Sequence, residues 1–118
     1  MRVRENLKRG TVEMIILHLL QERDKYGYEL CQEMRELSAG RFSVTESSMY
    51  PILYRLISAG ILSDRQEIVG RRRVRVYYHL EEAGQEYLKE LKAEYDATCK
   101  SIAKILNSTK AKKPAGKE

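Results

Sequence analysis

The sequence has few of the residues that build catalytic and metal sites. It contains two cysteines and two histidines. Cys31 and Cys99 fit no metal-binding or redox spacing, so we expect both to be buried thiols in a reducing compartment. We expect His18, in an apolar run, to be packed in the core, and His79 to lie on a surface strand. Neither histidine has the neighbours that catalysis or metal binding needs, so the sequence predicts no enzyme, metal site or cofactor.

Long hydrophobic segments are also absent. The longest apolar run, "MIILHLL", is too short to span a bilayer, and the N-terminal "MRVRENLKRG" has no apolar run of the kind found in signal peptides. Seven glycines and two prolines are too few for a fibrous or disordered chain, and 118 residues fit one domain. We therefore expect a soluble cytoplasmic protein with no membrane partner.

Positive charge is in excess, and it is concentrated. The chain has 22 Lys and Arg against 17 Asp and Glu, a net charge of +5. Residues 1–9, 64–79 and 108–118 each carry a surplus of basic side chains. Basic patches indicate a polyanionic partner, either nucleic acid or an anionic membrane, although a single patch can also serve solubility alone.

Apolar residues recur at helical spacing in four segments, and a further segment alternates as a hairpin does. Thr11 and Thr45 stand where the first and third helices would have their N-caps. Gly40 and Gly60 stand where the second and third would end, and Gly70 marks the turn of the hairpin. The expected elements are helices within residues 10–27, 27–40, 45–60 and 81–108, and strands over 61–70 and 71–80.

Three helices followed by a hairpin is the order of a winged helix-turn-helix, in which the third helix lies in the DNA major groove and the hairpin forms the wing. The third helix begins with short polar side chains that suit base edges and phosphates. Three successive arginines stand at the turn of the hairpin; a solvated edge strand would explain one of them, but three favour DNA. The candidate DNA contacts are Thr45, Ser47, Ser48, Tyr50, Arg55, Arg71, Arg72 and Arg73.

The final helical segment carries a heptad-like seam, which indicates pairing with a second helix. The seam consists of Leu88, Leu91, Tyr95, Thr98, Ile102 and Ile105. We therefore expect a homodimer. The expected organisation is a DNA-binding domain over residues 1–80, a dimerisation helix over 81–107 and a disordered basic tail over 108–118.

Three segments together, "KYGYEL", "RFSVTESSMYPILYRLISAGIL" and "GRRRVRVYYHLEEAG", resemble the PadR-type winged-helix transcriptional regulators over about residues 8–90. The resemblance implies a cytoplasmic homodimer, usually a repressor, on a palindromic operator. It places the recognition helix at residues 45–59 and the wing at 61–80. It also adds Tyr28, from "GYEL", to the DNA contacts, and makes the last helix the dimerisation helix of the subgroup with a short tail.

The chain departs from its relatives at two points. Many of them carry a histidine where this chain has Tyr26, and some short-tailed ones that bind flat aromatic drugs use a tryptophan at the dimer interface. This chain has no tryptophan, which argues against such a stacking pocket. Tyr87 and Tyr95 are the candidates for contact with a small-molecule effector, and a role in the core is the alternative for both.

The main alternative function is a winged-helix module that binds another protein and does not read DNA sequence. The arginine-rich turn and the basic ends of the chain argue against it. In the DNA-binding interpretation, paired final helices would set two recognition helices about 10 base pairs apart. A ligand that changed the packing of those helices would then release DNA.

Overall fold

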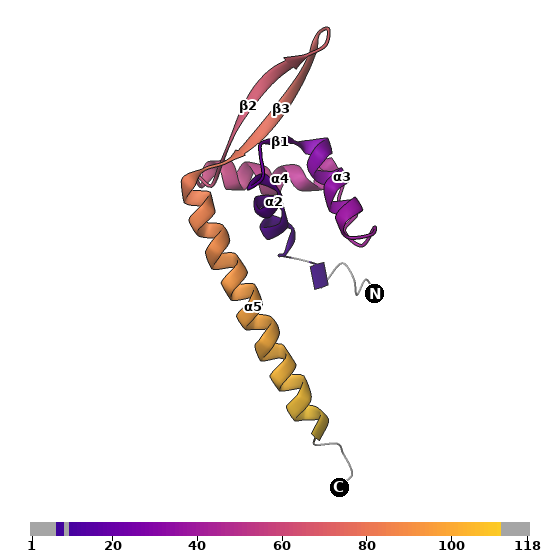
Figure 1. Cartoon of the computed structure of the whole chain (residues 1–118), viewed down its shortest axis with the longest axis vertical. Coiled ribbons are helices and arrows are strands. Elements are labelled where there is room, and N and C mark those ends of the chain that lie inside the picture. Colours follow the sequence, from indigo (N-terminus) through magenta and orange to yellow (C-terminus); the bar gives the residue numbers. More distant parts are fainter. Residues whose placement is uncertain (1–6, 9, 112–118) are drawn as a thin grey trace. The chain divides into compact units, whose positions relative to one another are not determined.

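The computed structural model describes residues 7, 8 and 10–111 of the chain, and Figure 1 shows its helices and strands. The chain divides into two compact units, Met1–Leu88 and Lys89–Glu118. The expected class, mainly α with a winged helix-turn-helix and a long C-terminal helix, is confirmed. The elements are α2 (Val12–Leu20), β1 (Lys25–Tyr26), α3 (Gly27–Leu37), α4 (Glu46–Ser58), β2 (Leu62–Val69), β3 (Arg73–Leu80) and α5 (Glu82–Ala111).

The helix α2 lies in the core of the first unit, where it contacts both α3 and β3. Its apolar residues on nearly every side predict this burial. His18, however, is exposed on α2, so the expectation of a packed histidine is wrong. The buried apolar side chains of the unit are Ile16, Leu17, Leu19, Leu20, Leu30, Cys31, Met34, Met49, Leu53, Leu56, Leu62, Tyr78, Leu80 and Leu88.

The two threonines expected to cap helices behave differently. Thr45 has an extended backbone, with ψ of 156°, and its side-chain oxygen accepts a hydrogen bond from the backbone N–H of Ser48 at 3.2 Å. This confirms the N-cap of α4. Thr11 has a helical ψ of −19°, and its hydroxyl donates to the backbone oxygen of Lys8 at 2.6 Å. The expected side-chain cap of α2 is therefore absent, because the preceding turn already places Thr11 in a helical conformation.

The hairpin is part of a three-stranded antiparallel sheet in the order β1-β3-β2. The sequence did not predict β1, because two residues are too few to show an alternating pattern. Tyr26 lies opposite Tyr77, and Tyr77 lies opposite Arg65 on the far strand. One row across the sheet therefore holds two tyrosines and an arginine. The N-terminal end of α3 follows β1 directly.

The two ends of the hairpin have different surroundings. At the end near the helices, Leu62, Tyr78 and Leu80 are buried. The turn lies at the other end, away from the helices of the unit (Figure 1), where the cross-strand pair Ile68 and Val74 is 79% and 56% exposed. Ile68 and Val74 lie on the same face of the hairpin as the buried Leu62, Tyr78 and Leu80. No helix that the structure describes covers that face near the turn, so the two side chains are exposed.

The helix α5 runs four residues past the expected boundary at 107, to Ala111. Residues 108–111 are therefore helical and not part of a disordered tail, while the rest of that expected tail, 112–118, lies outside the described residues. None of the helices described is both long and apolar enough to cross a membrane.

Candidate nucleic-acid interface

One side of α4 is buried and the other is open. Met49, Leu53 and Leu56 face the core and are at most 2% exposed. The open side carries an exposed stripe of two serines, a proline and a tyrosine at helical spacing, flanked by Ser48 and Arg55. Such a helix can enter a major groove with its apolar side still in the core. The stripe consists of Ser47, Pro51, Tyr54 and Ser58.

Only Ser47 of this stripe was predicted from the sequence, and Tyr54 is the largest of the three members that sequence reasoning missed. Its side chain is 58% exposed, and its ring stacks on that of Tyr50 with 6.0 Å between centroids and 15° between planes. Tyr50 is half-buried and donates a hydrogen bond to Glu46 at 3.4 Å. Tyr54 follows Ser47 by seven residues, or two helical turns, and this spacing in the sequence indicates that the two lie on the same side of the helix.

The hydroxyl groups at the start of α4 bond mainly to one another. Thr45 donates to Ser48 at 3.0 Å, and Ser48 donates to the backbone oxygen of Thr45 at 3.0 Å. Ser47 lies 3.3 Å from the Thr45 hydroxyl. All three predicted residues are exposed at the helix start, where the free backbone amides also favour an anion. Thr45 and Ser48 therefore shape this helix end as well as exposing polar atoms there.

Arg55, a predicted DNA contact, is exposed but paired within the chain. Its guanidinium donates to one carboxylate oxygen of Glu13, on α2, at 2.6 Å. The hydroxyl of Tyr87, on α5, donates to the other oxygen of the same carboxylate. One acidic group thus joins a residue of α4 to a predicted effector contact, a link that sequence separations of 42 and 74 residues conceal.

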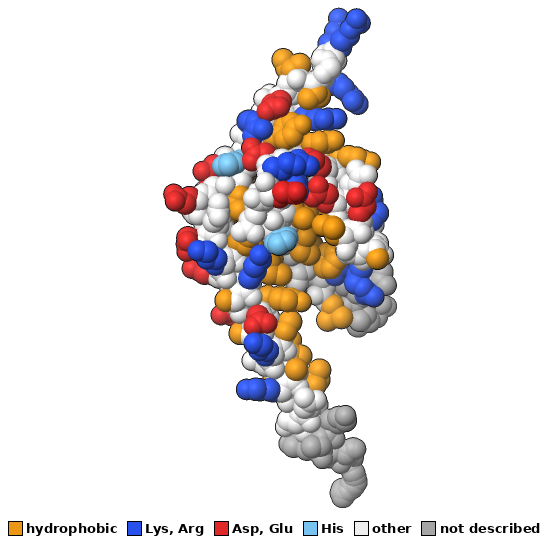
Figure 2. Space-filling view, viewed as in Figure 1, with side chains coloured by type: hydrophobic (Ala, Val, Ile, Leu, Met, Phe, Trp, Pro, Cys, Tyr) orange, Lys and Arg blue, Asp and Glu red, His pale blue; other side chains and the backbone are white. Residues whose placement is uncertain are grey.

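The wing arginines lie at the turn of the hairpin, as predicted. Arg71, Arg72 and Arg73 are exposed, and Figure 2 shows basic side chains gathered at that end of the hairpin. Gly70 and Arg72 have φ of 61° and 56°, the left-handed conformation that tight turns require. Among the described residues no carboxylate forms an ion pair with these three guanidinium groups. They remain available to a polyanion.

The cations near the base of the sheet are instead paired with acids. Arg65 binds Asp24 and Glu67, and His79 lies 2.7 Å from Asp24. Partial burial acts to raise the pKa of Asp24, but hydrogen bonds from His79 and Arg65 outweigh it and hold that pKa below its ordinary value. Lys25 is fully buried and pairs with Glu22 at 2.7 Å and Glu33 at 2.6 Å. These groups hold the sheet and helices together.

Tyr28, the DNA contact implied by "GYEL", is 53% exposed in the first turn of α3. Together with Tyr26 and residues of β3 it borders a hollow of about 360 Å³. The hollow brings Tyr28 and Arg73, two predicted contacts, to one place. Tyr26 and Arg75 also border it, and neither was predicted to contact DNA.

The predicted dimerisation seam divides between the two units. Leu88 is 1% exposed in the core of the first unit, so its assignment to a surface seam is wrong. Leu91 is half-buried, and the remaining four, Tyr95, Thr98, Ile102 and Ile105, are exposed on α5. Leu106, 62% exposed, lies beside Ile102 and Ile105 and was not predicted. This apolar stripe on a helix is where a second chain could pack.

The two cysteines have different environments. Cys31 is buried in α3, as expected, and burial raises the pKa of its thiol. Cys99 is exposed on α5, against expectation, and its hydrogen bond with Tyr95 raises the pKa of that phenol. The residues that the structure describes contain no cluster of three or more His, Cys, Asp or Glu side chains placed to hold a metal ion.

Comparison with known proteins gives one consistent result. The sequence profile of the "Transcriptional regulator PadR-like family" matches residues 16–90. A transcriptional regulator from Clostridium thermocellum has a TM-score of 0.76 and 32% identity, over 84% of this chain and 93% of that one. Transcriptional regulator Rv3488 of Mycobacterium tuberculosis is 36% identical over 70 residues, 59% of this chain and 63% of that protein. Bacillus subtilis PadR in complex with operator DNA has a TM-score of 0.64 and 26% identity, over 69% of this chain and 47% of that one.

Proposed function

Because the chain belongs to the PadR-like family of transcriptional regulators, we propose that it is a homodimeric repressor that binds a specific DNA sequence. The observation that carries this proposal is the pairing of two exposed features in one unit. One is the open stripe of α4, and the other is the group of arginines at the wing turn that have no acidic partner among the described residues. The solved complex of Bacillus subtilis PadR with operator DNA supports the same reading.

In this proposal α4 is the recognition helix and lies in the major groove. Ser47 and Tyr54 would face base edges, with Tyr50 beside them, while Thr45 and Ser48 would hold the helix start against phosphate. Arg71, Arg72 and Arg73 would follow the backbone or enter the minor groove. Arg55 would contact DNA only by sharing its guanidinium with, or leaving, Glu13.

The dimer would form through α5, with Leu91, Tyr95, Thr98, Ile102 and Ile105 in the seam. Half-exposed isoleucine and tyrosine side chains on one helix gain free energy when a second chain covers them. Two recognition helices held in this way would read an inverted repeat with half-sites about 10 base pairs apart. We place the protein in the cytoplasm, where its DNA would be.

An effector would act through the dimer. Tyr95 lies in the proposed seam, and Tyr87 donates to the carboxylate that also binds Arg55. A small molecule that contacted either tyrosine would favour one packing of the α5 helices over another and so change DNA affinity.

The experiment that tests the proposal is selection of bound sites from a random duplex library by the purified full-length protein at near-physiological salt. Enrichment of an inverted repeat, with dimeric mass in solution, is the expected result. Weak binding that depends on salt and enriches no sequence would contradict it, and would favour the protein-interaction module.

A further inference from the structure

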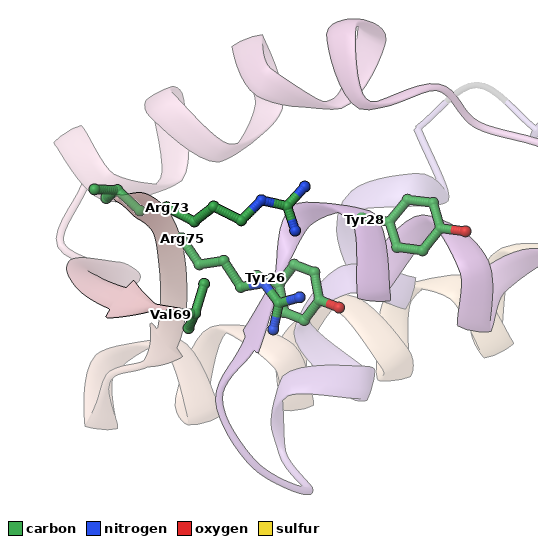
Figure 3. A pocket seen from close by; sticks show the side chains of 6 residues that line it. Tyr26, Tyr28, Val69, Arg73 and Arg75 are labelled. Atoms are coloured by element: carbon green, nitrogen blue, oxygen red, sulfur yellow. The ribbon is translucent and has the colours of Figure 1, made fainter. Parts of the chain in front are cut away.

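The hollow beside the wing is bordered by two cations and two phenols. It has a volume of about 360 Å³ and opens between β3 and the N-terminal end of α3. Figure 3 shows the side chains of Arg73 and Arg75 running from the strand toward Tyr26 and Tyr28. None of the lining side chains is acidic. They are Tyr26, Tyr28, Val69, Arg73, Val74 and Arg75.

Arg75 is held in this hollow by stacking. Its guanidinium lies over the ring of Tyr26, 4.2 Å from the centroid, and that ring meets the ring of Tyr77 edge-on at 5.5 Å. Stacking occupies the face of the guanidinium and leaves the N–H groups in its plane able to donate. No ion pair joins Arg75 to a carboxylate within the described part of the chain. Its donors are therefore oriented and open to a ligand.

Arg65, on the same face of the sheet, is a natural comparison. It also stacks on a tyrosine, with its guanidinium 5.2 Å from the centroid of Tyr77. Its N–H groups, however, bind Asp24 and Glu67. Arg65 and Arg75 thus share their packing and differ in whether acidic groups of the chain satisfy their donors.

We propose that this hollow binds a phosphate group of the DNA backbone, with Arg75 as its principal donor, Arg73 and Tyr28 beside it, and Tyr26 as the residue that positions Arg75. A guanidinium with in-plane donors matches the oxygens of a phosphate. The backbone fits better than a free anion, because Arg73 belongs both to this hollow and to the wing turn, so one polyanion can occupy both. The inference rests on the proposed function and adds a contact to it.

The first test compares Arg75→Gln with Arg65→Gln in the full-length protein, on a random-sequence duplex and on the selected site, between about 50 and 200 mM salt. We expect Arg75→Gln to weaken binding to both duplexes by about tenfold and to reduce the slope of log affinity against log salt by about one. Arg65→Gln should leave that slope unchanged. Thermal unfolding of both variants confirms that they remain folded.

The second test addresses the positioning role of Tyr26. Tyr26→Phe keeps the ring on which Arg75 stacks, and Tyr26→Leu removes it. We expect Tyr26→Phe to keep the wild-type salt slope and Tyr26→Leu to weaken binding by about threefold. In the Arg75→Gln background, Tyr26→Leu should weaken binding no further. An equal loss from Tyr26→Leu in both backgrounds would show that Tyr26 does not act through Arg75.

A third test locates the phosphate and identifies its source. Single neutral methylphosphonates are placed along the selected duplex; one position should weaken wild-type binding by about tenfold and leave Arg75→Gln unaffected. Inorganic phosphate then replaces chloride at constant ionic strength. If it weakens DNA binding in the wild type and not in Arg75→Gln, the two phosphates compete for the hollow and the assignment is supported. If inorganic phosphate binds the wild type through Arg75 and leaves DNA affinity unchanged, the hollow takes free phosphate only, and the assignment to the DNA backbone is overturned.

Failure of this inference and failure of the proposed function give different results. If the wild-type protein shows no salt-dependent DNA binding, the proposed function is wrong. If the wild type binds DNA and Arg75→Gln matches it in affinity and salt slope, the function stands and the hollow does not bind phosphate.

Discussion

The two ends of the β2–β3 hairpin share a register and differ in almost everything else. At the base, Leu80 and Tyr78 are buried, and the charged groups Arg65 and Asp24 satisfy each other. At the turn, apolar Ile68 is exposed, and three arginines have no acidic partner among the described residues. The same two strands thus pack in the hydrophobic core at one end and carry exposed positive charge at the other. Stability and DNA affinity should therefore respond to different halves of the same hairpin.

Removing the charge at the turn should have the largest effect, on DNA binding alone. We expect the triple change Arg71→Gln, Arg72→Gln and Arg73→Gln to weaken DNA binding about 100-fold, at about 1 kcal/mol for each lost phosphate contact. The salt slope should fall by about three. Titration of duplex DNA at several salt concentrations measures both, and urea unfolding should give the wild-type stability. A large loss of stability would mean that the turn also supports the fold.

The next largest expected effect is a loss of stability when a side chain is added to Gly84, which packs closely against Ile61 and Leu80 at the base of the hairpin. A Cβ on Gly84 would lie 2.4 Å from the backbone oxygen of Ile61 and 2.6 Å from Leu80. We expect Gly84→Ala to lower the free energy of unfolding by about 2 kcal/mol. Gly70→Ala at the turn is the matched control: it meets no atom within 4 Å, and only its φ of 61° is unfavourable, so it should cost about 1 kcal/mol. Equal losses would contradict the contrast between the two ends.

At Arg72 the effect of the charge on DNA binding can be measured separately from the effect of the backbone conformation on stability. Its φ of 56° is unfavourable for a residue with a side chain, so Arg72→Gly should raise the free energy of unfolding by about 0.5 kcal/mol while weakening DNA binding. Arg71→Gly removes the same charge without a positive φ to relieve and should lower stability by a similar amount. Urea unfolding and DNA titration of both variants test the pair.

The smallest expected effect is a dependence on pH confined to the base. The pKa of Asp24 lies below its ordinary value in the folded chain, so its carboxylate stabilises the fold above the ordinary pKa of about 3.9, and that contribution is lost as the pH falls. Asp24→Asn should therefore be slightly less stable than the wild type at neutral pH, by under about 0.5 kcal/mol. The difference should shrink in acid. Urea unfolding from pH 3 to 7 measures it, and a constant difference would exclude the carboxylate charge as its cause.

Local patterns predict most of the fold. Alternation in residues 73–80 and the helical spacing of Met49, Leu53 and Leu56 depend on neighbours in the sequence, and both are confirmed, although the strand begins two residues later than predicted. The same residue type can still behave in two ways: Thr45 caps a helix and Thr11 does not, because the backbone before each differs. A single sequence does not show that difference.

The contacts that join distant segments were beyond prediction. The pairing of β1 with β3 and the sharing of Glu13 by Arg55 and Tyr87 depend on how helices and strands pack. Leu88 fits a heptad equally well as a seam residue or as a core residue, and only the packed unit shows that it is core. Arg75 had the charge to suggest a DNA contact, but its ring partner Tyr26 lies on another strand.

The two thiols differ in exposure, so the natural sequence can be labelled at a single cysteine. Cys31 is buried and Cys99 is exposed, so a thiol-specific spin label should react at one site without any mutation. In a pair of chains joined along α5, two such labels would give one inter-label distance. That distance, followed as DNA or a small molecule is added, would report movement of the paired helices directly.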